Sequence, residues 1–335
     1  MGSRGFLTAC GAIIAATALL TQPAAAALRA PTRAHDSGAA AVLPPSPCTL
    51  SGGTRSCELW AKTGTLALPG GTTVPIWGYA ATAADPPTLP GPLLLATVGE
   101  TVSITLHNTL ADATSLGLPE QELPPDTAGA PPGGTRTYEF TATRPGTFRY
   151  EAGLTGGGPR QVAMGLAGAL VVRPVSGNSA YGTAATAFDD EALVVLQGVD
   201  PAFNAAPATY PTAKYRPRYW LINGAAYPGT AEIPTAAGHR LLLRYVNAGL
   251  EDHPMSLAGA FQQVVGADGR ALGHPYTVLS DTVVAGGTMD AIVSVPAVSR
   301  IPLFEAARHI DNAGHTTGGS VDFGGMLTFI TTAGP

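Results

Sequence analysis

The chemically functional residue types that first draw attention in this chain are those able to bind metal ions. Its 335 residues include seven histidines, three cysteines and five methionines. Two of the histidines, His309 and His315, lie six positions apart in the string HIDNAGH, which has the composition of a loop. That spacing matches no pair of ligands held rigidly on one face of a helix or strand, so these two residues alone only weakly indicate zinc.

Two glutamates occupy the same place in an internal repeat. Glu151 lies in the string YEAG and Glu305 in the string FEAA. Paired carboxylates suit a hard cation such as Ca²⁺, or serve as general acid and base in glycoside cleavage. Because Arg149, Arg160 and Arg308 lie nearby in the sequence, the simpler interpretation is a salt bridge at a domain contact for each glutamate.

The first 27 residues are typical of a secretory signal peptide. They contain one cation, Arg4, then an uncharged apolar run over residues 6–20 and small residues before position 28. The run is shorter than the roughly 20 residues that a bilayer core requires, so no membrane span is predicted. Residues 28–47 would then form a flexible N-terminus of a protein that is secreted or belongs to the cell envelope.

Cleavage of the signal peptide would leave two cysteines, Cys48 and Cys57. They are separated by nine positions across a turn that contains Gly. In an exported protein this pair is expected to form a disulfide. Two thiolate metal ligands are the competing interpretation, but no His or other Cys lies near them in the sequence.

The composition excludes several classes of partner and fold. There are 18 Lys and Arg against 23 Asp and Glu, a net charge of −5, and no blocks of like charge. Such a chain has no electrostatic footprint for nucleic acid or an anionic membrane. With 42 Gly, 30 Pro and only 12% charged residues, the composition favours a turn-rich β protein over a helical one.

A repeat with a period of about 140 to 155 residues divides the chain. Residues 99–108 align with residues 238–247, and each segment is an alternating strand that ends in Asn. Three further pairs of segments follow in the same order: 133–135 with 286–288, 150–153 with 304–307, and 165–172 with 324–330. We therefore predict an all-β fold of two tandem Greek-key β-sandwiches over residues 48–174 and 190–332, joined by a linker over residues 175–189.

Long runs in both copies carry a family resemblance. In the first copy they are PGPLLLATVGETVSITLHNTL, PGGTRTYEFTATRPGTFRYEAG and QVAMGLAGALVV, which resemble the first cupredoxin domain of the multicopper oxidases. In the second copy, WLINGAAYPG, GHRLLLRYVNAGLEDHPMSLAGAFQQVVGADG and FGGMLTF resemble a later cupredoxin domain. The resemblance implies two tandem cupredoxin-like domains, as in the two-domain laccases, which are exported enzymes that assemble as trimers.

The chain departs from that family at the copper-binding positions. The family holds a blue copper through two His and a Cys, and a trinuclear cluster through eight further His. The positions at which other residues replace these ligands are Gly117, Pro119, Glu151, Gly153, Ser256 and Ala258. No cysteine lies in the last motif window, residues 304–326, and the chain has seven of the ten histidines required.

One residual metal site is left as an alternative. By the resemblance, His253 keeps the place of a blue-copper ligand and could join His309 or His315 and Met326 around a single copper. A set of imidazole nitrogen and thioether sulfur would suit Cu(I). The competing interpretation is a histidine in a partly buried loop, hydrogen-bonded to backbone.

The leading hypothesis is a secreted multicopper-oxidase-like protein with degenerate copper sites and no cofactor. It would be a non-catalytic binding or structural module with an extracellular partner, and family analogy implies a homo-trimer. The alternative is a copper-binding oxidoreductase of multicopper oxidase type that uses the residual site of His253, His309, His315 and Met326.

Overall fold

A computed structural model describes residues 1–2, 43–307, 309–313, 316–317, 320–321 and 323–332. The predicted signal peptide, beyond its first two residues, and most of the predicted flexible segment 28–47 lie outside the described part. The described residues from 43 onward belong to one compact unit, Gly38–Pro335. No helix among the described residues is long and apolar enough to cross a membrane.

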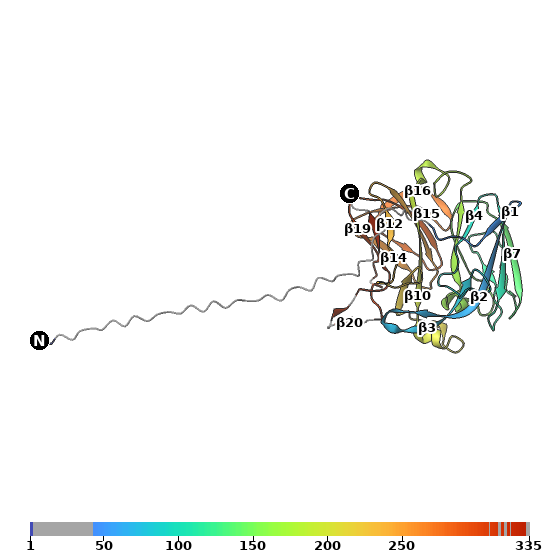
Figure 1. The fold of residues 1–335 in the computed structure, drawn as a ribbon, viewed down its shortest axis with the longest axis horizontal. Coiled ribbons are helices and arrows are strands. Elements are labelled where there is room, and N and C mark those ends of the chain that lie inside the picture. Colours follow the sequence, from blue (N-terminus) through green and yellow to red (C-terminus); the bar gives the residue numbers. More distant parts are fainter. Residues whose placement is uncertain (3–42, 308, 314–315, 318–319, 322, 333–335) are drawn as a thin grey trace. The chain divides into compact units, whose positions relative to one another are not determined.

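The first half of this unit forms two sheets that share a core (Figure 1). One sheet has the order β1-β2-β5-β7, with β3 also paired to β2: β1 (Thr49–Ser51), β2 (Thr54–Ala67), β3 (Thr73–Ala80), β5 (Thr101–Asn108) and β7 (Thr135–Thr141). The other has the order β4-β9-β8-β6: β4 (Leu94–Thr97), β6 (Leu116–Gly117), β8 (Gly146–Ala152) and β9 (Ala167–Arg173). Alternate residues of β5, such as Ile104 and Leu106, pack with Phe148 and Tyr150 of β8. The alternate apolar residues of a strand such as β5 therefore form part of one inner face of a β-sandwich.

The second half repeats this arrangement with sheets that contain more strands. One sheet has the order β11-β10-β13-β18-β15-β16: β10 (Asp190–Val199), β11 (Tyr219–Ile222), β13 (Arg240–Asn247), β15 (Gln262–Ala267), β16 (Arg270–Val278) and β18 (Thr288–Ser294). The other has the order β12-β22-β19-β14-β17: β12 (Ile233–Thr235), β14 (His253–Leu257), β17 (Ser280–Val283), β19 (Arg300–Glu305) and β22 (Leu327–Thr332). Leu243 and Tyr245 of the first sheet and Leu257 and Leu303 of the second lie in their common core.

The remaining elements are short. They are the helices α1 (Gly158–Ala163) and α2 (Pro201–Ala205), the 3₁₀ turns η1 (Pro69–Gly71), η2 (Ala184–Thr186) and η3 (Thr212–Lys214), and the two-stranded ladder of β20 (Thr316–Thr317) and β21 (Ser320–Val321). The segment predicted as a linker, residues 175–189, contains η2 and buries Ala180 and Phe188. Its ends are therefore held by packing against the second sandwich.

Equivalent strands of the two sandwiches pair in the same way. β5 pairs parallel with β2 and antiparallel with β7, and β13 pairs parallel with β10 and antiparallel with β18. Both β5 and β13 end in an asparagine, Asn108 or Asn247. Each Asn side chain donates to the carbonyl four residues on and to a second, more distant carbonyl, and accepts from the N–H two residues on. The predicted fold of two tandem cupredoxin-like β-sandwiches is thus confirmed.

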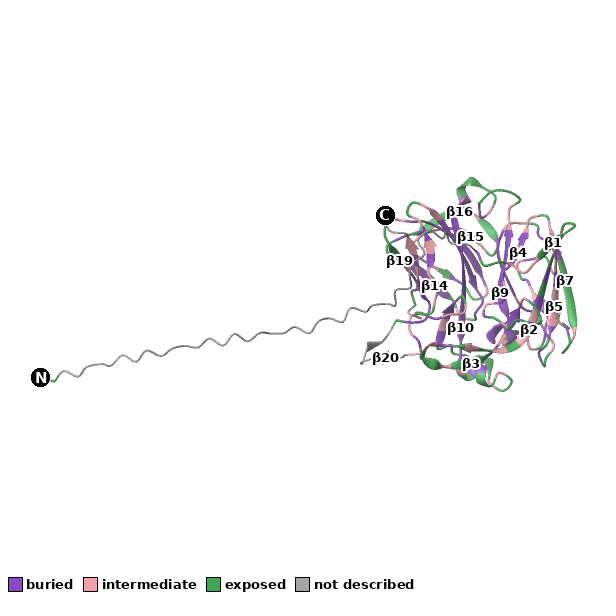
Figure 2. Ribbon diagram, viewed as in Figure 1, coloured by how far each residue is buried: buried purple, intermediate pink, exposed green. Residues whose placement is uncertain are grey.

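Strands β9 and β10 are buried on both faces because the two sandwiches meet along them. Ala169 and Val171 of β9 pack with Leu193 and Val195 of β10 in a separate apolar cluster. Figure 2 shows both strands as buried, whereas β7 at the far edge of the first sandwich is largely exposed. The contact between the sandwiches is therefore an apolar interface.

A buried polar network crosses the same interface. Arg244 of β13 is fully buried, with its Nε 3.0 Å from Glu191 Oε2 and its Nη1 3.0 Å from Thr147 Oγ1. Thr147, in β8 of the first sandwich, donates to Asp290 Oδ1 of β18 at 2.6 Å. Removing one member of a buried charged network leaves the others uncompensated, so the network favours a single arrangement of the two sandwiches.

Cys48 and Cys57 form a disulfide, with Cα atoms 4.3 Å apart. This confirms the pairing predicted from their spacing. The bridge joins the segment before β1 to β2, and Cys57 is itself buried in the core of the first sandwich. It therefore holds the start of the first sandwich to its central sheet.

Candidate metal site and interdomain pocket

The second sandwich brings one carboxylate and two imidazoles together. β14 begins at His253 and β19 ends at Glu305. The register of these two strands pairs Met255 with Glu305, so the strand ends lie side by side. His309 follows β19 after a short turn, and its backbone N–H donates to Glu305 Oε2 at 3.0 Å. Strand register and one turn are thus sufficient to assemble the cluster.

The side chains of this cluster approach one another through one oxygen. Glu305 Oε1 lies 3.1 Å from His309 Nδ1 and 3.5 Å from His253 Nδ1. The three potential ligand atoms all lie within 4.8 Å of one another. His309 stacks on Trp220, with ring centroids 4.2 Å apart and an interplanar angle of 6°. The indole therefore restricts the orientation of the His309 ring.

Several polar atoms of the cluster have no hydrogen-bond partner among the described residues. His253 and Glu305 are fully buried, whereas 27% of the His309 side chain is exposed. The unpartnered atoms are both ring nitrogens of His253, Glu305 Oε1 and His309 Nδ1. The contacts of 3.1 and 3.5 Å are within ion-pair distance but lack the direction of a hydrogen bond. Since buried polar groups are nearly always paired, this concentration is unusual.

The charges within the cluster favour an ionised carboxylate. Burial acts to raise the pKa of Glu305, but the polar contacts with His253 and His309 outweigh it and lower the pKa to about 2. The carboxylate in turn raises the pKa of His309, although burial opposes this effect. Glu305 is therefore an anion throughout the physiological range of pH.

The described partners of Glu305 are two histidines, because the strand register brings β14 beside the end of β19. Arg308 and His315 lie outside the described residues, so the predicted salt bridge between Glu305 and an arginine stays a prediction. The Met326 N–H donates to the His309 carbonyl, and the Met326 carbonyl accepts from the Glu305 N–H. The Met326 side chain belongs to the buried core of the second sandwich.

In the first sandwich, the positions of the replaced family ligands hold an ion pair and closely packed backbone. Glu151 pairs in register with Gly117, and its Oε2 lies 2.7 Å from Arg149 Nη1. This is the salt bridge that the sequence predicts. Burial raises the pKa of Glu151, and Arg149 opposes that shift. A Cβ added at Gly153 would lie only 2.4 Å from Ser115 Oγ.

Three further positions of replaced ligands lie apart from this ion pair. Pro119 lines a pocket between the sandwiches. Ser256 is buried in β14, and its hydroxyl donates to the Leu279 carbonyl at 3.5 Å. Ala258 is exposed just beyond β14. Proline and alanine side chains carry no ligand atom.

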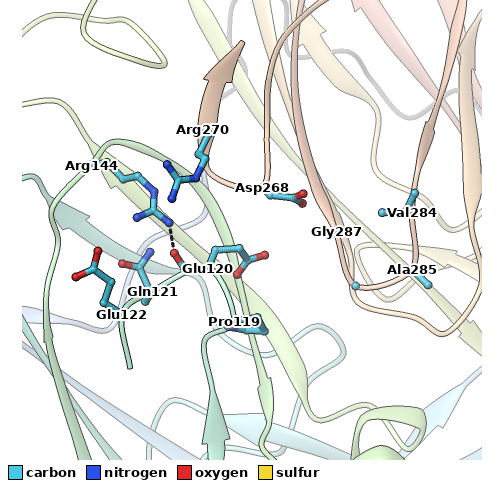
Figure 3. Close-up of a pocket in the computed structure, with 11 residues that line it drawn as sticks. Pro119, Glu120, Gln121, Glu122, Arg144, Asp268, Arg270, Val284, Ala285 and Gly287 are labelled. Carbon is cyan, nitrogen blue, oxygen red and sulfur yellow. Dashed lines mark hydrogen bonds between the residues drawn. The ribbon is translucent and has the colours of Figure 1, made fainter. Parts of the chain in front are cut away.

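The pocket between the sandwiches has a volume of about 560 Å³ (Figure 3). Its walls are residues 119–122 and Arg144 of the first sandwich, and Asp268, Arg270 and residues 284–287 of the second. Arg144 donates to the backbone carbonyls of Glu120 and Gly269 and so joins the two walls. In Figure 3 the side chains of Arg144 and Arg270 lie next to each other, with Asp268 farther along the pocket. The pocket is therefore polar and carries charges of both signs.

Glu120 has the most perturbed carboxyl group of this pocket. Burial raises its pKa to about 7, with a further contribution from Asp268 and an opposing one from Arg149. Its Oε2 accepts from the Arg149 N–H at 3.4 Å. The sequence contains no signal for this shift, because residues far along the chain bury the side chain.

Comparisons with known proteins agree with this architecture. Residues 63–177 match the family model described as multicopper oxidase. Copper-containing nitrite reductase from Alcaligenes xylosoxydans xylosoxydans is 25% identical over 224 residues, which are 61% of this chain and 68% of that protein. A probable nitrite reductase-hydroxylamine oxidoreductase fusion protein from Kuenenia stuttgartiensis is 33% identical over 133 residues. That match covers 36% of this chain, which spans only 16% of the length of the fusion protein.

A solved structure shares the fold over most of its length. The crystal structure of blue copper oxidase from Nitrosomonas europaea superimposes with a TM-score of 0.71 at 21% identity, over 83% of this chain and 86% of that one. The fold and the strand pairing define a cupredoxin-type protein of two sandwiches. The match to the multicopper oxidase family model lies within the first sandwich and the segment that follows it, and the likeness to the solved structure extends the cupredoxin-type fold to both sandwiches.

Proposed function

We propose that this is an exported multicopper-oxidase-like protein with degenerate copper sites, which acts as a non-catalytic binding module. The observation that carries the proposal is the packing around Gly153, where the family places a histidine ligand. A Cβ at this position would lie 2.4 Å from Ser115 Oγ and 3.2 Å from the carbonyl carbon of Leu116. Ser115 would therefore have to move before any side chain could occupy position 153, which supports the absence of a histidine ligand from this part of the first sandwich.

The charge at the neighbouring family position supports the same conclusion. Glu151 is held by the guanidinium of Arg149, of which only 10% is exposed. A copper ion beside Glu151 would either displace the Arg149 guanidinium or be repelled by its positive charge, and this repulsion is strong at low local dielectric. The pair is thus a structural substitute for metal, consistent with a scaffold kept for a purpose other than oxidation.

Two observations support export. Residues 1–27 are typical of a signal peptide, and the Cys48–Cys57 disulfide suits an oxidising compartment. Assembly as a trimer rests on family analogy alone. Size-exclusion chromatography with light scattering tests it, and a monomer in solution would remove that part of the proposal.

The interdomain pocket is the binding surface that fits this role best. Arg144 and Arg270 lie side by side there (Figure 3), and the buried Nε2 of Gln121 has no partner among the described residues. Grouped donors of this kind bind an acidic group of a ligand, which would face the carboxylates of Glu120, Glu122 and Asp268 elsewhere in the same pocket. We therefore infer a small extracellular ligand with an acidic group. Calorimetric titration with citrate as a probe should show binding to the wild type and not to Arg270→Ala.

Metal content and oxygen consumption test the non-catalytic role. Purified protein is loaded with Cu²⁺ and dialysed, copper is counted by mass spectrometry, and oxygen uptake is followed with a phenolic substrate. We expect no oxygen uptake and no intense thiolate-to-copper absorption. Four tightly held coppers per chain together with oxygen consumption would overturn the proposal.

A second candidate function is favoured by one specific observation. Among the described residues, both ring nitrogens of the buried His253 have no hydrogen-bond partner and lie beside His309, which suits a mononuclear copper oxidoreductase. The similarity to a copper-containing nitrite reductase adds to it. Electron paramagnetic resonance of the Cu²⁺-loaded protein, with turnover of nitrite as the activity, tests this candidate. Bound copper without turnover in the wild type would reject it.

A further inference from the structure

The cluster of His253, Glu305 and His309 holds more ligand atoms than its neighbours satisfy. His253 and Glu305 are fully buried, and the cluster contains four polar atoms that have no hydrogen-bond partner among the described residues. Each buried polar group left in that condition destabilises the folded state. A metal ion would accept the lone pairs of all three side chains at once. We propose that His253, Glu305 and His309 together bind a Zn²⁺ ion.

The donor set decides the class of metal. A blue copper site needs a soft thiolate, and both described cysteines are joined in a disulfide in the first sandwich. Two imidazoles and one carboxylate are instead a common three-residue set for zinc. Glu305 therefore converts the place of an electron-transfer metal into a site for an ion that does not change its oxidation state. The buried negative charge also offsets part of the charge of the ion.

The distances fit such an ion without rearrangement of the backbone. Ligand atoms about 2.0–2.1 Å from a tetrahedral zinc lie roughly 3.3–3.4 Å from one another. The two measured separations from Glu305 Oε1, 3.1 Å to His309 and 3.5 Å to His253, bracket that value. Small rotations of the side chains would direct the donor atoms to a common centre.

The surroundings provide both rigidity and access. Trp220 stacks on the His309 ring and limits its rotation. The ladder between β14 and β19 fixes the position of Glu305, and the ladder between β14 and β17 fixes that of His253. The partial exposure of His309 places the route to solvent on its side of the cluster. A preorganised site of this kind loses little entropy on binding its ion.

Zinc binding is tested on the purified full protein after treatment with a chelator. Isothermal titration with ZnCl₂ should show one ion per chain and a rise in the melting temperature. Co²⁺ in place of Zn²⁺ should give the visible absorption of a tetrahedral ion. Glu305→Gln and His309→Gln should each weaken binding by more than about 100-fold, because each removes a direct ligand. His274→Gln, on the exposed strand β16, is the matched control and should bind as wild type does.

The outcomes separate this inference from the proposed function. A wild type that binds no Zn²⁺, or variants that bind it as tightly as wild type, would overturn the zinc site and leave the non-catalytic role as it stands. Oxygen consumption by a four-copper protein would overturn that role alone. If His309→Gln melts like wild type without metal and has lost the zinc-induced rise, the loss of binding reflects the ligand and not misfolding.

Discussion

Replacement of Glu120 by Gln should change how the free energy of unfolding depends on pH. Burial raises the pKa of this carboxyl group from its ordinary 4.5 to about 7 in the folded protein. The folded state therefore binds a proton more tightly than the unfolded chain does. Gln resembles the protonated form in shape and neutrality, so the variant removes this difference while keeping an acceptor for the Arg149 N–H.

The size and sign of the effect follow from the two pKa values. Below pH 4.5 the carboxyl group is protonated in both the folded and the unfolded state, and its favourable contribution to the free energy of unfolding is fully present. As the pH rises from 4.5 to 7, the unfolded state releases its proton first, so stability is lost; above pH 7 the loss is complete. A shift of about 2.5 units corresponds to roughly 3 kcal/mol, which is a ceiling for a half-buried group. Relative to wild type, Glu120→Gln should gain up to that amount between pH 4.5 and 7.

Urea denaturation of both proteins at a series of pH values between 4 and 8 measures this gain, with equal m-values as the condition for comparison. The other titrating groups occur in both proteins, so they cancel in the difference. Glu122→Gln, at the exposed neighbouring glutamate, serves as the control and should follow the wild-type curve. If plots of the free energy of unfolding against pH run parallel for wild type and Glu120→Gln across this range, the burial of Glu120 does not govern its titration, and the reasoning is wrong.

Three further changes should alter stability in denaturation experiments. Gly153→Ala should cost about 1–3 kcal/mol, because its Cβ would overlap the neighbouring Ser hydroxyl; an unchanged midpoint would show that an imidazole could also fit. The double replacement of Cys48 and Cys57 by Ala should cost about 2.5 kcal/mol through lost constraint on the unfolded chain, and wild-type stability would contradict this. Arg244→Met should cost about 3–5 kcal/mol by leaving buried carboxylates such as Asp290 uncompensated, whereas a neutral result would mean that the network is replaceable by apolar packing.

Much of the fold could be predicted from local pattern. The alternation along residues 101–108 and its repeat along 240–247 predicts strands with one buried face, and both strands are present. The matched Asn108 and Asn247 make equivalent hydrogen bonds. The candidate site was harder to predict from the sequence than the fold. The family resemblance predicts His253 and His309 in one site, whereas the sequence pairs Glu305 with an arginine because only residues close in the chain can be compared.

The sequence by itself determined the number of sandwiches and the disulfide, because each depends on residue type and spacing along the chain. The tertiary structure alone decided which polar groups meet. The register between β14 and β19 places Glu305 against two imidazoles, and Glu120 shares its pocket with Asp268, Arg270 and residues 284–287. Both are contacts between segments far apart in the chain. Their distances and dielectric surroundings, and hence their chemistry, arise only when the sheets pack.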